Sequence, residues 1–183
     1  MTRMTSRRAG LIVGVAALVV AAGWWFTRAA PERVAIDLLK TYPGARRQPA
    51  ERLFSVVDAT VGGTAKSAIV TPDQSRITWP HVTIPEDGWL RVSLGIKENG
   101  WTTPGGGVQF FVIVSDGKTP EGVLTRQLNP FSVPSDRGWR DELVDLTSYG
   151  GATVDIIFNT RAGPRADTNE DLALWGAPQI VIR

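Results

Sequence analysis

The chain has 183 residues, including 19 glycines, 12 prolines, one histidine and no cysteine. Without cysteine, disulfide bonds, a thiol nucleophile and a cysteine-ligated zinc site are all excluded, and the single histidine, His81, excludes a multi-histidine metal centre. The frequent glycine and proline residues predict many turns between short strands rather than long helices.

The formal net charge of +2 is distributed unevenly along the chain. Residues 1–50 contain 8 Lys/Arg and 2 Asp/Glu, a net charge of +6, whereas residues 51–183 contain 12 Lys/Arg and 16 Asp/Glu, a net charge of −4. An acidic globular part argues against binding to a phosphate backbone, so we expect no nucleic-acid partner. The basic N-terminal part is better explained by membrane topology.

The N-terminal segment is predicted to be a membrane anchor. Residues 10–26 are uncharged, and their 17 positions lie at the short end of the range for a helix that spans a bilayer. Basic residues precede the segment and aromatic residues close it; these are Arg3, Arg7 and Arg8, then Trp24, Trp25 and Phe26. We therefore expect residues 1–9 to form a cytoplasmic tail, residues 10–26 to cross the cytoplasmic (inner) membrane once, and the rest to lie outside the cytoplasm.

A cleaved signal peptide is the alternative for the same segment. Its apolar core would run from Leu11 to Val20, and Val20-Ala21-Ala22 offers small residues for a cleavage site. The aromatic residues that follow would be an unusual start for a mature chain, which favours the retained anchor.

Residues 27–50 are predicted to form a stalk that contains a short helix at 32–42. Val34, Leu38 and Tyr42 recur at helical spacing, and Pro43-Gly44 would end the helix. Residues 45–50 would be a linker. The apolar stripe of Val34, Leu38 and Tyr42 would dock on the domain, lie on the membrane, or bind an envelope protein partner.

Residues 51–183 are predicted to form an all-β domain. Leucine, valine and isoleucine alternate with other residues over 90–96, which predicts a strand with one buried face, and residues 108–114 are apolar at nearly every position, which predicts a strand covered on both faces. So many short strands with turn signals between them predict a β-sandwich or jelly roll. The other strand candidates are residues 54–57, 68–70, 77–79, 82–84, 123–128, 143–146, 154–158 and 180–182.

Several short motifs occur between Phe54 and Arg183. They are Asp87-Gly88-Trp89-Leu90, Leu94-Gly95, Gly107-Val108-Gln109-Phe110, Asp116-Gly117, Trp139 with Val144-Asp145-Leu146, Tyr149-Gly150-Gly151, and Asp171-Leu172-Ala173-Leu174-Trp175-Gly176-Ala177-Pro178. Together they resemble galactose-binding-like jelly-roll modules of bacterial envelope proteins, similar to carbohydrate-binding modules. The resemblance implies a jelly-roll β-sandwich, and no catalytic residue can be carried over from it.

Trp101 is the best candidate for a ligand-binding residue. It lies in a polar, glycine-rich loop, and an aromatic ring there would offer its face to a sugar while polar side chains bind the hydroxyl groups. Glu98, Asn99 and Arg161 would supply those hydrogen bonds. The alternative is that Trp101 folds back as a plug over one end of the sandwich.

Oxygen-rich side chains gather near the end of the polar loop that begins at Arg161. Asp167, Asn169, Glu170 and Asp171 could supply ligands for Ca²⁺, which prefers oxygen, although their spacing matches no defined calcium motif. The alternative is a solvated loop whose Asp and Asn side chains cap a turn. We therefore expect no required cofactor and keep a structural calcium ion at Asp167, Asn169 and Asp171 as a hypothesis.

Three functions remain open from the sequence. The first is a membrane-anchored, exported binding module for glycans of the cell envelope, which we expect not to be an enzyme. The second is a structural or assembly subunit of an envelope complex, joined through Val34, Leu38 and Tyr42. The third and least favoured is an enzyme of polysaccharide metabolism, because no catalytic constellation is visible and His81 is best explained as a strand-edge or turn residue.

Overall fold

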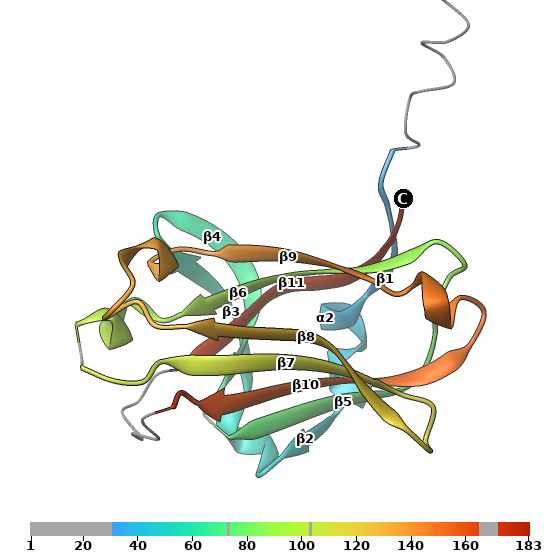
Figure 1. The fold of residues 1–183 in the computed structure, drawn as a ribbon, viewed down its shortest axis with the longest axis horizontal. Coiled ribbons are helices and arrows are strands. Elements are labelled where there is room, and N and C mark those ends of the chain that lie inside the picture. Colours follow the sequence, from blue (N-terminus) through green and yellow to red (C-terminus); the bar gives the residue numbers. More distant parts are fainter. Residues whose placement is uncertain (1–30, 73, 103, 165–171) are drawn as a thin grey trace, which may run out of the picture. The chain divides into compact units, whose positions relative to one another are not determined.

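Two antiparallel β-sheets pack face to face in the computed structural model, which describes residues 31–72, 74–102, 104–164 and 172–183 (Figure 1). Sheet A has the strand order β3-β4-β11-β6-β9, with β1 also pairing β11, and sheet B has the order β2-β5-β10-β7-β8. The chain alternates between the sheets, so this all-β sandwich fits the predicted jelly roll. The strands are β1 (Arg33–Asp37), β2 (Arg46–Gln48), β3 (Ser55–Val61), β4 (Thr64–Thr71), β5 (Ser75–Thr83), β6 (Gly88–Ile96), β7 (Val108–Ser115), β8 (Pro120–Leu128), β9 (Arg140–Asp145), β10 (Thr153–Ala162) and β11 (Ala173–Ile182).

Short helices connect several of these strands. The α-helix is α2 (Leu38–Thr41), and the 3₁₀ helices are η1 (Tyr42–Gly44), η2 (Glu51–Leu53), η3 (Glu98–Trp101), η4 (Pro134–Asp136) and η5 (Thr147–Tyr149).

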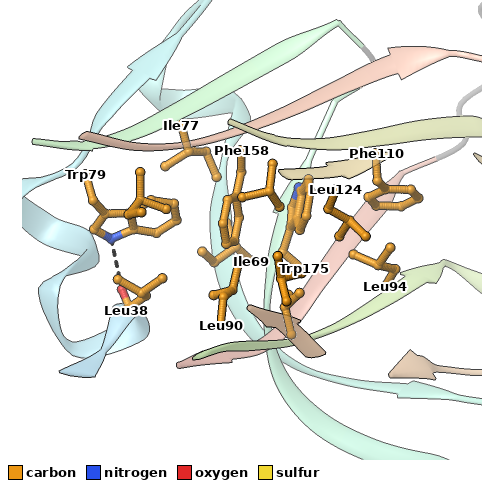
Figure 2. Close-up of a cluster of buried hydrophobic side chains, with 14 of the residues drawn as sticks. Leu38, Ile69, Ile77, Trp79, Leu90, Leu94, Phe110, Leu124, Phe158 and Trp175 are labelled. Atoms are coloured by element: carbon orange, nitrogen blue, oxygen red, sulfur yellow. Dashed lines mark hydrogen bonds between the residues drawn. The ribbon is translucent and has the colours of Figure 1, made fainter. Parts of the chain in front are cut away.

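The core between the sheets is centred on an aromatic stack. Trp175 of β11 is fully buried, stacks on Phe158 with ring centroids 4.3 Å apart, and meets Phe110 edge-on at 5.0 Å (Figure 2). These rings come from both sheets, so their burial joins the two layers and removes large apolar areas from water.

The alternation predicted for 90–96 is confirmed on the core side of β6. Leu90, Val92, Leu94 and Ile96 are fully buried, and the opposite face at the C-terminal half of this strand is buried as well. Strand β7 differs from the prediction, because its residues alternate between buried and half-buried rather than being covered fully on both faces. The outer face of sheet A is therefore buried at the C-terminal half of β6, which the sequence did not predict.

The candidates at 77–79 and 82–84 form one strand, β5, with an irregularity between them. The pairing with β10 shifts register here, and His81 has a φ of 55° and donates its backbone N–H to Oδ1 of Asp155 at 3.0 Å. His81 is therefore an exposed residue in a β-bulge of β5, beyond residues 76–78 that pair with β2, so β5 is the edge of the sheet at this point, as expected for an edge-strand residue.

The helix predicted for 32–42 is wrong over its first part. Residues 33–37 form β1, which pairs with residues 179–182 of β11, beside the stretch 173–176 where β4 pairs with the same strand. Beyond the stretch that pairs with β4, the backbone N–H and C=O groups on this side of β11 need hydrogen-bond partners, and β1 supplies them. The helix α2 begins only after Asp37, whose Oδ1 accepts a hydrogen bond from the N–H of Leu39 at 3.0 Å.

The apolar stripe of Val34, Leu38 and Tyr42, expected to dock on the domain, lie on the membrane or bind a partner, is mostly used inside the sandwich. Leu38 is fully buried, and Tyr42 packs against the same core, with its ring 6.4 Å from that of Trp79. Only Val34 stays exposed, at 45%. The docking alternative therefore holds for Leu38 and Tyr42, and the proposed partner surface loses two of its three residues.

The domain also begins earlier than predicted. Residues 46–48 of the expected linker form β2, which pairs with β5 at the edge of sheet B, and Arg33–Ile182 is one compact unit. Residues 33–50 are thus part of the sandwich rather than a stalk outside residues 51–183.

The predicted tail at 1–9 and the anchor at 10–26 lie outside the described residues. Within the part of the chain that the structure describes, no helix has the length and apolar character needed to cross a membrane.

Candidate functional site

An open hollow of about 450 Å³ lies at one end of sheet B. Three neighbouring strands of that sheet, β2, β5 and β10, contribute to its lining. The lining residues are Gln48, Pro49, Gln74, Ser75, Arg76, Asn159, Thr160, Arg161 and Ala162. We call this feature the sheet B hollow.

Strand alternation explains why polar side chains face this hollow. Ile77 and Phe158 are buried in the core, so their neighbours Arg76 and Asn159 project from the opposite face of the sheet. Arg76 is directly paired with Gln48 on one side and with Asn159 on the other. Adjacent strands therefore present a row of polar side chains on the outer surface of the sandwich.

Hydrogen bonding organises the middle of this row. Nε of Arg76 donates to Oδ1 of Asn159 at 3.0 Å, and Asn159 is only 5% exposed although it faces away from the core. The guanidinium group of Arg161 lies over the ring of Phe111, 5.3 Å from its centroid. This cation–π contact orients the Arg161 side chain beside Asn159.

Two buried hydroxyl groups lie under the rim of the hollow. The hydroxyl of Thr160 donates to the backbone oxygen of Pro72 at 2.8 Å and is also hydrogen-bonded to the hydroxyl of Ser75. Because Thr160 has one proton and Pro72 O only accepts, Ser75 must be the donor in the second bond. This chain of bonds holds the start of β5 against the end of β10, which lends rigidity to the wall of the hollow.

The lining is rich in hydrogen-bond donors and positive in charge. Among its described residues, the arginines Arg76 and Arg161 are the charged ones, and the others are neutral. Residues 33–183, which include the whole sandwich, contain 16 Lys/Arg and 17 Asp/Glu, so the domain is close to neutral and the two arginines make this hollow locally basic. Its chemistry suits a ligand with many oxygen acceptors.

A second hollow of about 420 Å³ lies along the seam between β8 and β9, the edge strands of the two sheets. Arg126 of β8 and Glu142 of β9 bridge this seam with an Nε–Oε1 distance of 2.6 Å. In the same hollow, the hydroxyl of Tyr149 donates to Oε2 of Glu121 at 2.6 Å. Burial and this carboxylate raise the pKa of Tyr149 to about 12. The polar groups named here already bind one another, so this hollow is a weaker candidate.

The outer face of sheet A is closed by Trp139. Its indole ring lies on Gly95 and Gly176, and a Cβ atom at Gly176 would lie 2.8 Å from Cζ3 of the ring. The indole Nε1 donates to the backbone oxygen of Thr64 at 2.8 Å. The Leu94-Gly95 and Trp175-Gly176 motifs thus have a physical reason, because only glycine leaves room for this ring.

A charged network borders Trp139 on the same face. Nζ of Lys66 donates to Oδ1 of Asp141 at 2.6 Å and to Oγ of Ser93 at 2.7 Å, and lies 5.7 Å from the Trp139 ring. Burial of Asp141 acts to raise its pKa, but the hydrogen bonds from Lys66 and Ser93 and the charge of Lys66 leave that pKa below its ordinary value. Because Nζ of Lys66 and Oγ of Ser93 both donate to Oδ1 of Asp141, the polar groups of this network bind one another.

The four residues predicted to bind a ligand are divided between the two sheets. Trp101 is half-buried, donates from Nε1 to the backbone oxygen of Ile96 at 3.0 Å, and packs on a small apolar cluster on the outer face of sheet A. Glu98 and Asn99 lie with it in η3, and Oε1 of Glu98 accepts from the N–H of Gly62. Arg161 lies in sheet B and lines the sheet B hollow.

Arg76, Asn159, Gln48 and Gln74 line the same hollow but were missed from the sequence. Their signal is weak, because it consists of polar residues at or beside the ends of three strands, β2, β5 and β10, that are separated in the chain. Strand pairing alone makes them neighbours.

The predicted calcium ligands Asp167, Asn169 and Asp171 lie outside the described residues. In residues 31–72, 74–102, 104–164 and 172–183, no group of three or more His, Cys, Asp or Glu side chains could hold a metal ion.

Known structures share the architecture of the sandwich and its sheets. The carbohydrate-binding module CBM27-1 of Caldicellulosiruptor saccharolyticus, in complex with mannohexaose, has a TM-score of 0.57 at 10% identity, over 85% of this chain and 98% of that one. TmCBM61, in complex with β-1,4-galactotriose, has a TM-score of 0.55 at 12% identity, over 82% and 99% of the two chains. The chain has the fold of a carbohydrate-binding module. A third module with this fold, CBM51 from Clostridium perfringens GH95 in complex with methyl-galactose, has a TM-score of 0.54 at 13% identity, over 79% and 98%.

Sequence comparison finds a longer relative. An uncharacterised protein of Archaeoglobus fulgidus is 36% identical over 113 residues, which are 61% of this chain and 28% of that protein. The chain therefore spans less than a third of that relative's length. No protein-family profile matches the chain.

Proposed function

We propose that this chain is a glycan-binding module that acts by recognition rather than catalysis. The sheet B hollow is the observation that carries the proposal, because it places arginine, asparagine and glutamine side chains side by side on the surface of the sandwich. Sugar hydroxyls both donate and accept hydrogen bonds, and amide and guanidinium groups are suitable partners for them. Modules of the same fold in complex with galactose- and mannose-containing sugars support the proposal.

Preorganisation adds to the support. Asn159 is held by Arg76, Arg161 is held by Phe111, and the wall behind them is fixed by the Ser75–Thr160 bond. Side chains that are already ordered lose less conformational entropy when a ligand binds. An open hollow with ordered polar side chains can thus select among extended polysaccharides by hydrogen-bond pattern.

Affinity electrophoresis of the full chain in non-ionic detergent, in gels that contain galactan, mannan or an acidic polysaccharide, tests the proposal. We expect at least one polysaccharide to retard the protein, and the double variant Gln48→Ala/Gln74→Ala to reduce the retardation. Gln109→Ala is the matched control, because Gln109 lies on the same sheet but outside the lining. Retardation by no polysaccharide, or equal loss in the control, contradicts the proposal.

We also propose that residues 10–26 anchor the domain to the cytoplasmic membrane, with the sandwich outside the cytoplasm. The support is the uncharged segment, its preceding arginines and its closing aromatic residues. We expect the protein to remain with membranes after alkaline carbonate extraction. We also expect the sandwich to be digested by protease added on the outer side of the cytoplasmic membrane. N-terminal sequencing distinguishes the retained anchor, which begins at residue 1 or 2, from a signal peptide cleaved near Ala22.

A further inference from the structure

The two arginines of the sheet B hollow form a matched pair on its surface. Arg76 lies directly opposite Asn159 in the β5–β10 pairing, and Arg161 is two residues further along β10, on the same face. Diagonal neighbours of this kind lie about 7–8 Å apart at their Cα atoms, within reach of long side chains. Both side chains extend across the same outer face of sheet B, Arg76 toward Asn159 of β10 and Arg161 toward Phe111 of β7.

The contacts that Arg76 and Arg161 make within the protein leave their guanidinium groups available to a ligand. Nε of Arg76 donates to Asn159, and the face of the Arg161 guanidinium lies on the ring of Phe111. Neither contact is an ion pair, whereas Arg126 binds Glu142 through both Nε and a terminal nitrogen. Both arginines line the hollow, and the lining contains no carboxylate among its described residues.

Two guanidinium groups on neighbouring strands, with no carboxylate among the described residues of the lining, have an electrostatic cost that a ligand can offset. Like charges on neighbouring strands repel each other, and an oxyanion placed between them removes the repulsion and accepts charge-assisted hydrogen bonds from both. The planar arginine fork matches a carboxylate or sulfate group much better than it matches a neutral hydroxyl.

We propose that the ligand of the sheet B hollow is an acidic sugar, whose carboxylate or sulfate group binds between Arg76 and Arg161. This inference rests on the proposed glycan-binding function and specifies its substrate class. It separates this chain from the modules of similar fold, whose sugars in their complexes are galactotriose, methyl-galactose and mannohexaose.

Isothermal titration of the full chain in non-ionic detergent, with four polysaccharide probes, tests the inference. The probes are polygalacturonate, the same polymer with its carboxylates methyl-esterified, a neutral galactan, and a sulfated galactan. We expect binding to polygalacturonate or to the sulfated galactan. The methyl-esterified polymer or the neutral galactan, respectively, should bind at least about tenfold more weakly, and affinity for the acidic polymer should fall as the salt concentration rises. The polymer that binds identifies the oxyanion as a carboxylate or a sulfate.

Variants assign this binding to the hollow rather than to the basic N-terminal region. We expect Arg76→Gln and Arg161→Gln each to weaken binding at least about tenfold. Arg76→Lys, which keeps the charge but loses the fork, should give an intermediate loss. Arg33→Gln is the matched control, because it removes the same charge from an exposed position in sheet A. Unfolding midpoints measured on every variant confirm that each protein is folded, and Arg161→Gln spares the Arg76–Asn159 bond.

The outcomes separate the two proposals. Binding to neutral galactan that equals binding to the acidic polymers, and that survives both arginine substitutions, overturns the acidic ligand and leaves the glycan-binding function standing. If Arg33→Gln weakens binding to the acidic polymer as much as Arg76→Gln and Arg161→Gln do, the acidic-ligand proposal is also overturned, because the binding is then nonspecific. Binding to none of the four probes overturns both proposals.

Discussion

The indole Nε1 of Trp79 donates a hydrogen bond to the backbone oxygen of Leu38 at 3.1 Å, across 41 positions of sequence (Figure 2). Both residues are buried, and the bond joins α2 to β5. A segment that the sequence presents as a stalk is by this contact a part of the core, so its stability and that of the sandwich are linked.

Replacing Trp79 with phenylalanine should loosen α2. The substitution keeps an aromatic ring but leaves the buried oxygen of Leu38 without its donor, which costs about 1–3 kcal/mol of unfolding free energy. Chemical denaturation measures the global loss, and hydrogen exchange should rise locally over residues 38–44. Trp101→Phe is the control, because it also removes an indole hydrogen bond to a backbone oxygen but lies on the outer face of sheet A. Equal exchange at 38–44 in both variants would contradict the link.

Replacing Gly176 with alanine should destabilise the domain through Trp139. The new methyl group would approach the ring at 2.8 Å, and relief of this overlap costs about 1–3 kcal/mol. In Gly176→Ala/Trp139→Leu the two effects should be less than additive, which a double-mutant cycle measures. Gly122→Ala is the matched control in a strand, since a Cβ there would meet nothing within 4 Å. A cycle without coupling would contradict the packing argument.

The ionisation of Tyr149 should depend on Glu121. Because its folded-state pKa of about 12 exceeds the ordinary value of 10.0, the protonated phenol stabilises the fold fully below pH 10, and this contribution is lost as the pH rises toward 12. In a Tyr42→Phe background, absorbance titration reports Tyr149 alone, since the chain has two tyrosines. Glu121→Gln should lower the midpoint, and the control Glu98→Gln should not. An unchanged midpoint in Glu121→Gln would show that burial alone sets the pKa.

The Lys66–Asp141 pair should stabilise the domain at neutral pH and not in acid. The pKa of Asp141 lies below its ordinary 3.8, so its contribution is present above pH 3.8 and is lost as the pH falls through the lowered value. We expect Lys66→Met to be less stable than the unaltered protein at pH 7, with a difference that shrinks in acid. Lys40→Met, at an exposed position of α2, should show no such trend. A constant difference between pH 7 and acid would assign the effect to packing on Trp139.

The parts of the fold that depend on local pattern could be predicted from the sequence. Most of the strands from β3 to β10 follow from period-two burial, an apolar run and turn residues, because adjacent side chains in a strand always face opposite ways, whereas only residues 180–182 of β11 were predicted as a strand. The stalk prediction was wrong because it rested on local pattern alone. Residues 33–37 carry no pattern that excludes a helix, and their strand conformation comes from pairing with β11, which lies far along the chain.

The candidate site shows where sequence stops being sufficient. Composition, hydropathy and charge determine by themselves that this chain has an uncharged N-terminal segment, an acidic C-terminal part and many short strands. Only the tertiary structure decides that Trp101 lies on the outer face of sheet A while Arg161 joins Arg76 and Asn159 in a hollow of sheet B. Arg76 and Asn159 are 83 positions apart, and they meet because β5 and β10 pair in one particular register. That register is set by which faces the two strands bury against the core, and so by the whole sandwich rather than by either strand.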